Sequence, residues 1–314
     1  MRVLVAGATS VPGLPLLMEL AARGHDVVGL TRQSSKTPQI EQAGAKPVVA
    51  DVFDADQINA VVADIEPEVV VSLLTTLPKR GPMRFKDFEP ARALWGRGAP
   101  NLVAAAQRAG VRRIVAESVM FAYGYPTTGP ALMDESDPYP GPPPPGGEAM
   151  LKALRDMEQT VLTSGQHSDT EGIVLRYGVF YGPGVPHDEM FTRLVKWWAM
   201  PAPTGNGVVS WVHIDDVAKA TADAVDKGRG GQIYNIVDDR PQSFGDYIRE
   251  LSAALHRPKP LLMPRRLFGL VAPYGAIAFG DTWLPLSNAK AKADLGWTPI
   301  TRNQALRSRS GSAR

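Results

Sequence analysis

The sequence of 314 residues contains no cysteine. This absence excludes disulfides, cysteine-ligated zinc, iron–sulfur clusters and a thiol nucleophile, and it is compatible with a cytoplasmic protein. The chain also lacks a strong charge of one sign, because 34 Lys and Arg residues face 32 Asp and Glu residues. A net charge of +2 creates no large field, so we expect neither nucleic acid nor an anionic membrane as a partner.

Long apolar runs are missing as well. No stretch approaches the roughly 20 residues that cross a bilayer, and the N-terminus has no signal-peptide pattern. The five histidines are scattered without the spacing of metal ligands, so we expect no metal site. With 44% hydrophobic and 21% charged residues, the composition is that of an ordinary globular protein.

Short apolar runs alternate with helical patterns through the first half of the chain. Strands are predicted at Val3–Ala6, Val27–Leu30, Val48–Ala50, Val69–Leu74 and Arg113–Ala116, and later at Ile173–Arg176 and Gln232–Ile236. Helices are predicted near Asp54–Ile65, near Ala91–Ala109 and after an N-cap at Asp215 or Asp216. This alternation predicts right-handed βαβ units in an α/β fold, and the Val, Leu and Ile content indicates parallel strands that are buried on both faces.

A glycine-rich turn joins the first strand to the first helix and predicts a dinucleotide site. Gly7 allows the tight turn, Gly13 allows close packing, and Pro12 suits the first turn of a helix. The free amides of that turn attract a diphosphate. Ser10 replaces the usual middle glycine, so its hydroxyl either donates to a phosphate or crowds it. The alternative is a strand–helix turn without a ligand; the candidate residues are Gly7, Ala8, Thr9, Ser10, Val11, Pro12 and Gly13.

The end of the second predicted strand distinguishes the two nicotinamide dinucleotides. An acidic residue there would bind the ribose hydroxyls of NAD, but this chain has Thr31 and Arg32, with Lys36 nearby. A guanidinium can pair with a 2′-phosphate, so NADP(H) is favoured over NAD(H), although an exposed arginine without a ligand is the alternative. After the third strand, Asp51 and Val52 are expected near the adenine, and a simple turn aspartate is equally compatible.

Several stretches together resemble extended or atypical short-chain dehydrogenases/reductases, of the kind grouped with NAD-dependent epimerases and dehydratases. They are Gly7–Gly13, Ala109–Val115, Leu175–Gly184, Trp211–Ala218, Tyr234–Ile236 and Leu295–Pro299. The resemblance implies a Rossmann-type doubly wound parallel sheet with a small C-terminal substrate-binding lobe. We therefore predict one NAD(P)-binding domain over residues 1–307, with the lobe formed mainly by about 180–215 and 240–300, and a disordered tail over 308–314.

The same resemblance implies further cofactor contacts and a catalytic group. Leu73, Leu74 and Thr75 would follow the fourth strand, and Tyr177, Gly178 and Val179 would line the nicotinamide. Family members usually carry a serine after the central strand and a tyrosine four positions before a lysine on one helix face, where the lysine lowers the pKa of the phenol. Ser118 resembles that serine, although its spacing to Tyr123 is one residue longer than usual.

The tyrosine–lysine pair is not found in the sequence. Lys152 is the one lysine at a suitable place, and Glu148 stands four residues before it; if Glu158 sets the register, the pair becomes Met150 and Leu154. Lys152 either binds the cofactor ribose or is a solvated helix lysine. Three explanations stay open: another group supplies the proton, no strong acid is needed, or the cofactor binds without turnover. The candidate proton donors are Tyr123, which we prefer, and Tyr125, Tyr177 and Glu148.

Aromatic residues favour an apolar substrate over a sugar phosphate. The expected lining comprises Met83, Phe85, Phe121, Tyr181, Phe191, Trp197, Trp198 and Trp211, although some of these are compatible with the core. His213 is interpreted as a structural residue at a helix start.

Taken together, these residues predict an NADP(H)-dependent oxidoreductase acting on a small, partly apolar carbonyl, imine or enone, in which Ser118 and Tyr123 polarise the acceptor. The alternatives are an epimerase or dehydratase and a non-catalytic NADP(H) sensor, and a homodimer is a common arrangement in the family.

Overall fold

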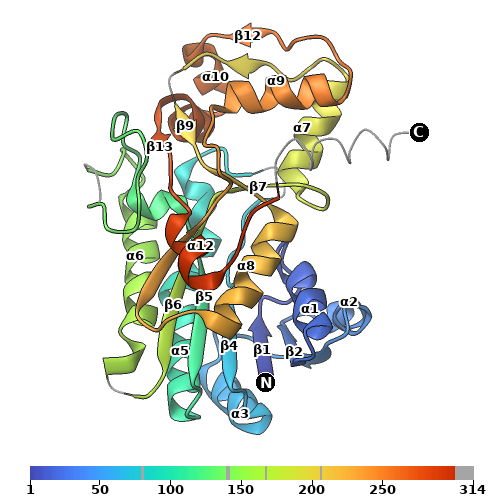
Figure 1. The fold of residues 1–314 in the computed structure, drawn as a ribbon, viewed down its shortest axis with the longest axis vertical. Helices are drawn as coiled ribbons and strands as arrows, with labels where there is room; N and C mark the ends of the chain where they lie inside the picture. The colour runs from blue at the N-terminus through green and yellow to red at the C-terminus, as the bar shows by residue number, and fades with distance from the viewer. Residues whose placement is uncertain (79–80, 139–141, 167, 206, 301–314) are drawn as a thin grey trace.

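A parallel seven-stranded sheet forms the centre of the computed structural model (Figure 1). The structure describes residues 1–78, 81–138, 142–166, 168–205 and 207–300, so the predicted tail at 308–314 lies outside the described residues. The strand order is β11-β6-β5-β4-β1-β2-β3. The strands are β1 (Arg2–Ala6), β2 (Asp26–Thr31), β3 (Lys46–Val49), β4 (Val69–Ser72), β5 (Arg113–Val119), β6 (Glu171–Tyr177) and β11 (Gln232–Ile236).

Helices cover both faces of this sheet, so the predicted Rossmann-type doubly wound fold is confirmed. One face carries α3 (Ala55–Ile65), α4 (Glu89–Ala93), a π-helical turn (Leu94–Gly98), α5 (Ala99–Arg108) and α6 (Glu148–Leu162); the single helix predicted over Ala91–Ala109 is therefore interrupted by that turn. The other face carries α1 (Gly13–Ala22), α2 (Thr37–Gln42) and α8 (Ile214–Lys227). Two apolar cores fill the space between the sheet and these helix layers, and both contain strand residues that are almost fully buried.

The lobe at the top of Figure 1 is built from the later part of the chain. It contains α7 (Pro186–Lys196), α9 (Phe244–Ala254), α10 (Arg265–Val271) and α11 (Pro273–Gly275), followed by a π-helical turn (Ala276–Asp281). Three short parallel pairs support it, β7 (Val179–Tyr181) with β10 (Trp211–His213), β8 (Ala202–Pro203) with β12 (Leu262–Met263), and β9 (Val208–Val209) with β13 (Trp283–Leu284). The last helix among the described residues, α12 (Ala289–Leu295), packs against α8 and β11.

Two helix starts differ from the sequence-based expectation. Pro12 is the N-cap of α1, and the helix itself begins at Gly13. His213 is the N-cap of α8, where its Nδ1 accepts a hydrogen bond from the amide of Asp215, so the helix begins at Ile214 rather than after Asp215 or Asp216. The structural role predicted for His213 is confirmed. An imidazole nitrogen here replaces the side-chain oxygen that usually caps a helix.

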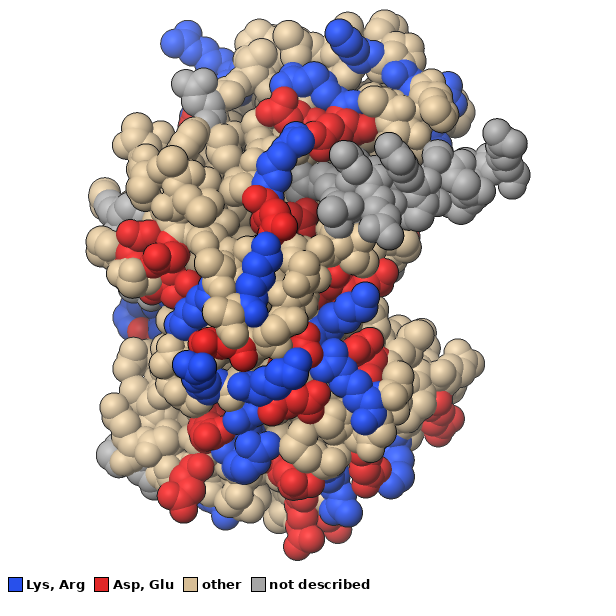
Figure 2. Space-filling model, viewed as in Figure 1, with Lys and Arg blue, Asp and Glu red and all other residues tan. Residues whose placement is uncertain are grey.

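Charged side chains are mixed on the face seen in Figure 2, where Lys and Arg alternate with Asp and Glu over α1 and α8. Arg23, which follows α1 directly, contributes to this pattern, because it pairs with Asp223 and Asp226 of α8. Within the described ranges no helix is both long enough and apolar enough to cross a bilayer. The same ranges contain no group of three His, Cys, Asp or Glu side chains that could hold a metal ion.

Candidate active site

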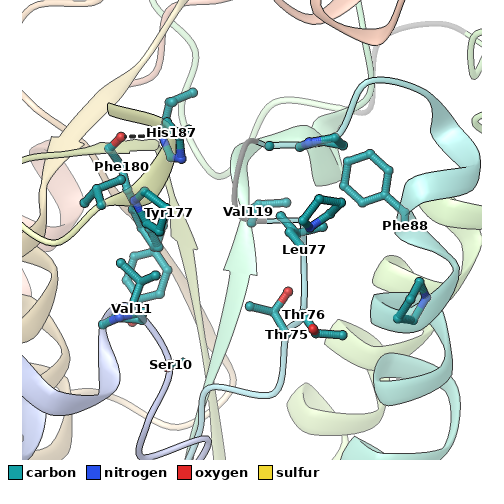
Figure 3. A pocket seen from close by; sticks show the side chains of 18 of the residues that line it. Ser10, Val11, Thr75, Thr76, Leu77, Phe88, Val119, Tyr177, Phe180 and His187 are labelled. Carbon is teal, nitrogen blue, oxygen red and sulfur yellow. Dashed lines mark hydrogen bonds between the residues drawn. The ribbon is translucent and has the colours of Figure 1, made fainter. Parts of the chain in front are cut away.

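A cavity of about 1120 Å³ opens at the carboxyl ends of the strands, between the sheet and the C-terminal lobe. This is the edge at which open α/β sheets bind ligands. Figure 3 shows Val11 and Tyr177 on one side and Thr75, Thr76 and Leu77 across from them. The cavity continues from the glycine-rich turn into the lobe, so a single space can hold a dinucleotide and a substrate.

The glycine-rich turn is shaped by the absence of two side chains. Gly7 has a φ of 85°, and a Cβ there would lie 2.3 Å from the carbonyl oxygen of Leu73. At Gly13 a Cβ would lie 2.5 Å from the carbonyl oxygen of Ala8, so this glycine clears the turn itself rather than the sheet. Ala8 and Gly13 are buried and do not line the cavity, whereas Thr9, Ser10, Val11 and Pro12 do.

The residues of this turn fit a diphosphate. The Ser10 hydroxyl is buried and has no hydrogen-bond partner within the described part of the chain, and Ser10 lines the cavity. The first turn of α1 contains no acidic side chain that would repel an anion. An unpaired buried hydroxyl costs free energy unless a ligand satisfies it, which favours a phosphate oxygen at this point.

The strand-end residues expected at the adenosine half lie together around the cavity. Thr31, Arg32, Lys36, Asp51 and Val52 all line it. Arg32 is exposed and forms no ion pair among the described residues. Asp51 accepts a hydrogen bond from the amide of Phe53 at 3.0 Å, as a turn aspartate does, so its second carboxylate oxygen is the one left for a ligand.

The residues expected at the nicotinamide half also line the cavity. They are Leu73, Leu74, Thr75, Tyr177, Gly178 and Val179. The Tyr177 hydroxyl shares a 2.7 Å hydrogen bond with Thr221 of α8, and burial raises the pKa of this phenol far above its usual value. Tyr177 therefore offers the cavity an aromatic surface and no acidic proton.

Ser118 does not face the cavity. Its hydroxyl is buried on the other face of β5 and donates to Oε1 of Glu158 in α6 at 2.5 Å. Glu158 in turn forms an ion pair with Arg176 at 2.6 Å, and both side chains are 2% exposed. The residues before and after Ser118 on the strand, Glu117 and Val119, are the ones that line the cavity. Successive side chains of a strand point to opposite faces, so Ser118 faces α6, and the position one residue closer to Tyr123, which faces the cavity, is Val119.

Tyr123 and Lys152, the other two predicted catalytic residues, also do not line the cavity. Tyr123 is fully buried, and its hydroxyl lies within hydrogen-bond distance of the backbone oxygen of Asp134 and of Oδ1 of Asn235, at 3.1 and 3.2 Å. Lys152 is 75% exposed and pairs with Asp156 on its own helix. Met150 and Leu154, the alternative positions, are buried in the core. The 15 residues of α6 include no tyrosine.

The predicted substrate residues divide into two groups. Met83, Phe121 and Phe191 line the cavity. Tyr181 and Trp211 belong to the core instead: the Tyr181 hydroxyl donates to Asp238, and Trp211 stacks on Tyr247 with ring centroids 4.1 Å apart. Trp197 is 80% exposed on the outer surface, and Trp198, Phe85 and the remaining predicted donors, Tyr125 and Glu148, also lie outside the lining.

Other lining residues were missed by the sequence analysis. The lobe contributes apolar side chains from α7, α9, β12, α10, α11 and the adjoining turns, which are Met190, Leu194, Met200, Phe244, Met263, Phe268, Tyr274 and Phe279. Of the described lining residues, the cationic ones are Arg32 and Lys36, both at the adenosine half. Arg193, Lys196, Arg265 and Arg266 do not reach the cavity. The substrate half is therefore apolar.

Apart from tyrosines, two titratable side chains in the described part of the chain line the cavity outside the adenosine half. His187 of α7 is tied to the backbone oxygen of Phe180 through Nε2 at 2.8 Å (Figure 3), and burial lowers its pKa. A neutral ring held in this way donates from Nε2 and leaves Nδ1 as an acceptor. Glu117 of β5 is buried, and its Oε2 has no hydrogen-bond partner among the described residues. Burial raises the pKa of this carboxyl to about 8.

Comparison with known proteins shows where this architecture recurs. The model of the NAD dependent epimerase/dehydratase family matches residues 3–237. A relative from a Streptomyces species, named 3-diazoavenalumate denitrifying reductase, is 36% identical over 303 residues, covering 95% of this chain and 96% of its own length. A ketoreductase of Stigmatella aurantiaca that is named for a farnesylated dihydroquinoline oxide is 26% identical, covering 98% of this chain and 85% of its own.

Solved structures share the fold at lower identity. UDP-glucose 4-epimerase of Thermus thermophilus in complex with NAD superposes with a TM-score of 0.79 and 23% identity, covering 100% of both chains. The corresponding Thermotoga maritima enzyme with UDP-glucose gives a TM-score of 0.78 and 21% identity, covering 98% of this chain and 96% of its own.

Proposed function

The chain belongs to the NAD-dependent epimerase/dehydratase family and is an NAD(P)-dependent oxidoreductase, and we propose that it is an NADP(H)-dependent reductase of an apolar, electron-poor acceptor. The apolar substrate half of the cavity is the observation that carries this proposal. Bound NADPH supplies a hydride. The chain itself binds the diphosphate with the turn at Ser10, pairs Arg32 with the 2′-phosphate, and excludes water from the acceptor with the lobe.

The site favours an acceptor that takes hydride without a strong acid. Val119 faces the cavity in place of Ser118, and α6 has no tyrosine in either possible register of the pair, which is Glu148 with Lys152 or Met150 with Leu154. A carbonyl that becomes an alkoxide needs a proton or a strong hydrogen bond in the transition state. Enones, iminium groups and other activated acceptors need less acid catalysis. The negative charge that arrives with the hydride is delocalised in an enone and neutralises the positive charge of an iminium group.

A diazo group is a second candidate acceptor, favoured by the relative that is 36% identical and named as a reductase of a diazo compound. Hydride delivered to the terminal nitrogen of a diazonium group gives a diazene. Loss of dinitrogen from the diazene leaves hydrogen on carbon, so that R–N₂⁺ and H⁻ become R–H and N₂. No proton donor is required in the hydride step, which suits a cavity without a lining tyrosine poised as an acid.

Sugar nucleotides, such as the UDP-glucose of the Thermotoga maritima structure, fit this cavity poorly. A second diphosphate would need cations in the substrate half, and the described residues there provide none. An epimerase would also have to remove a proton from a hydroxyl, for which the family uses the tyrosine that α6 lacks. His187 instead offers one acceptor, which suits a phenol or an alcohol on an otherwise apolar molecule.

The test is NADPH oxidation, followed by absorbance, with three kinds of acceptor and controls without enzyme. An aryl diazonium carboxylate and an aryl enone represent the proposed class, and a UDP-4-ketosugar, which unlike UDP-glucose has a carbonyl that can accept a hydride, represents the sugar nucleotides. We expect turnover with at least one of the first two and none with the UDP-4-ketosugar. Turnover with the UDP-4-ketosugar alone, or tight NADPH binding with no turnover over a broad panel, would contradict the proposal, and the second result would favour a sensor.

A further inference from the structure

Glu117 is a buried acid that the proposed hydride step does not use. It lies two residues before the end of β5, and it is 7% exposed. One carboxyl oxygen is buried without a hydrogen-bond partner among the described residues, and the side chain lines the cavity. Buried polar groups are almost always satisfied, so a carboxyl left unpaired at a cavity wall indicates a ligand that completes it.

The position of β5 in the sheet places Glu117 toward one half of the dinucleotide. The diphosphate site lies at the end of β1, and Arg32 and Asp51 mark the adenosine half at the ends of β2 and β3. β5 lies on the opposite side of β1, beyond β4, and its other neighbour is β6, which carries Tyr177. The switch point of a doubly wound sheet separates the two nucleotides in this way. Glu117 therefore lies in the nicotinamide half.

Few ionisable groups surround this carboxyl. Tyr177 of β6 faces it, and its phenol stays neutral because burial raises its pKa. The β4 end and the α1 turn contribute Leu73 and Val11 to the same cavity, and α8 contributes Thr221 as the hydrogen-bond partner of Tyr177; none of these three side chains ionises. The other titratable lining residues are His187 from α7, Tyr274 from α11, whose pKa is raised by burial, and, at the adenosine half, Arg32, Lys36 and Asp51. Burial alone accounts for the raised pKa of Glu117.

We propose that Glu117 binds the nicotinamide half of the cofactor as a neutral acid, so that its ionisation weakens NADPH binding more than NADP⁺ binding. A carboxylate repels the anionic diphosphate in both cofactors. The oxidised nicotinamide ring carries a positive charge that attracts the same carboxylate, whereas the reduced ring is neutral. Proton loss from Glu117 therefore shifts the preference of the site toward the oxidised cofactor. This inference rests on the proposed cofactor site.

The consequence for binding has a definite sign. Because the pKa of Glu117 is about 8, the carboxyl is protonated at lower pH, and NADPH then binds without exchanging a proton with it. At higher pH the free protein is ionised there, and NADPH binding must be accompanied by uptake of one proton. The dissociation constant for NADPH then rises by up to about tenfold per pH unit, the limit for a single linked proton.

The experiment measures NADPH and NADP⁺ binding by calorimetry between about pH 7.5 and 9.5, which brackets the pKa of Glu117, with the intact chain and its Glu117→Gln variant. Glutamine keeps the shape and cannot ionise, and circular dichroism checks that the variant is folded. The matched control is Glu41→Gln, an exposed glutamate of α2 outside the cavity. A second measurement repeats the NADPH titration of the unaltered protein at about pH 8.5 in two buffers of different ionisation enthalpy, which counts the protons taken up.

We expect the NADPH dissociation constant to rise about tenfold or more over this range, the NADP⁺ constant to change less, and Glu117→Gln to remove the difference. Glu41→Gln should behave as the unaltered protein does. Equal pH dependence in the Glu117→Gln variant, or no proton uptake in the two-buffer comparison, would overturn the role of Glu117. If neither NADPH nor NADP⁺ bound at the lowest pH, the proposed cofactor site itself would be overturned.

Discussion

Arg32 stands at the rim of the cavity at the end of β2, exposed and free of ion pairs among the described residues. We predict that Arg32→Ala raises the dissociation constant for NADPH by about 10- to 100-fold, because a charge-assisted hydrogen bond contributes about 1.5–3 kcal/mol. NADH, which lacks the 2′-phosphate, should be affected much less. Fluorescence titration with both nucleotides measures this. The control is Arg266→Ala, which removes an exposed arginine outside the cavity. Equal losses of affinity for NADPH and NADH in Arg32→Ala would show that Arg32 does not select the 2′-phosphate.

Ser118 gives the second residue-scale prediction. Since its hydroxyl donates to the buried Glu158, Ser118→Ala should lower the free energy of unfolding by about 1.5–3 kcal/mol, the range for a hydrogen bond to a charged group. Cofactor affinity and kcat should stay nearly unchanged. Urea denaturation measures the change in the free energy of unfolding, and steady-state kinetics measure kcat. If kcat fell about tenfold or more while stability was unchanged, Ser118 would have to act on the substrate.

Individual residues also show what the sequence can and cannot predict. The sequence placed Gly7, Ser10 and Arg32 at the cavity because each lies within a few positions after a short apolar strand, at the edge of the sheet where the cavity opens. Ser118 was assigned to the wrong face of β5, since the alternation of side chains along a strand decides which face each one reaches, and Tyr123 lies in a buried turn that follows this strand. The one-residue excess in their spacing was the available signal. Glu117 was missed because a single acid in an apolar strand has no motif.

Helix α10 of the lobe carries both a side chain that lines the cavity and one that is exposed to solvent. On α10, Phe268 lines the cavity, whereas Leu270 two residues later is 80% exposed. We predict that Phe268→Ala raises KM for an apolar acceptor about tenfold, because burying a large side chain against a ligand contributes about 1.5–3 kcal/mol. NADPH affinity should not change, and Leu270→Ala should leave both constants unchanged. Steady-state kinetics test this, and similar effects of the two variants would contradict the assignment.

At the scale of elements, apolar patterns predicted the strands better than they predicted the lining of the cavity. All seven central strands were expected near their observed places, because continuous Val, Leu and Ile runs are typical of buried parallel strands. Aromatic residues gave a weaker signal. Trp211 and Tyr181 fill the core, and Trp197 is solvent-exposed, since composition cannot tell a packed ring from one that lines a cavity. Only the tertiary arrangement separates these cases.

The whole molecule should respond to pH through its buried acids. The pKa of Glu117 is raised from 4.5 to about 8, so its protonated form is favoured by folding, and the stability this provides is lost as the pH rises between these two values. We predict that Glu117→Gln becomes progressively more stable than the unaltered protein over this range, by up to about 1.4 kcal/mol per pH unit. Urea denaturation of both proteins without cofactor at about pH 5, 7 and 9 measures the difference. A constant difference would show that the carboxyl ionises equally in the folded and unfolded chains.

One cavity unites parts of the molecule that are far apart in the sequence. The diphosphate turn, Arg32 and the apolar lobe come from separate segments, and the carboxyl edge of the sheet brings them together. Local patterns predict each segment, but their convergence follows from the strand order. The homodimer and the boundaries of the domain, expected from the sequence, stay predictions.

Calorimetric titration of the intact protein with NADPH and with NADH at about pH 7 is the decisive experiment. It tests in one measurement whether the glycine-rich turn binds a dinucleotide and whether the site prefers the cofactor with the 2′-phosphate. We predict one site per chain, with NADPH bound about tenfold or more tightly than NADH, as one charge-assisted pair with the 2′-phosphate would give. Absence of binding by both nucleotides, or tighter binding of NADH, would contradict the proposed cofactor site.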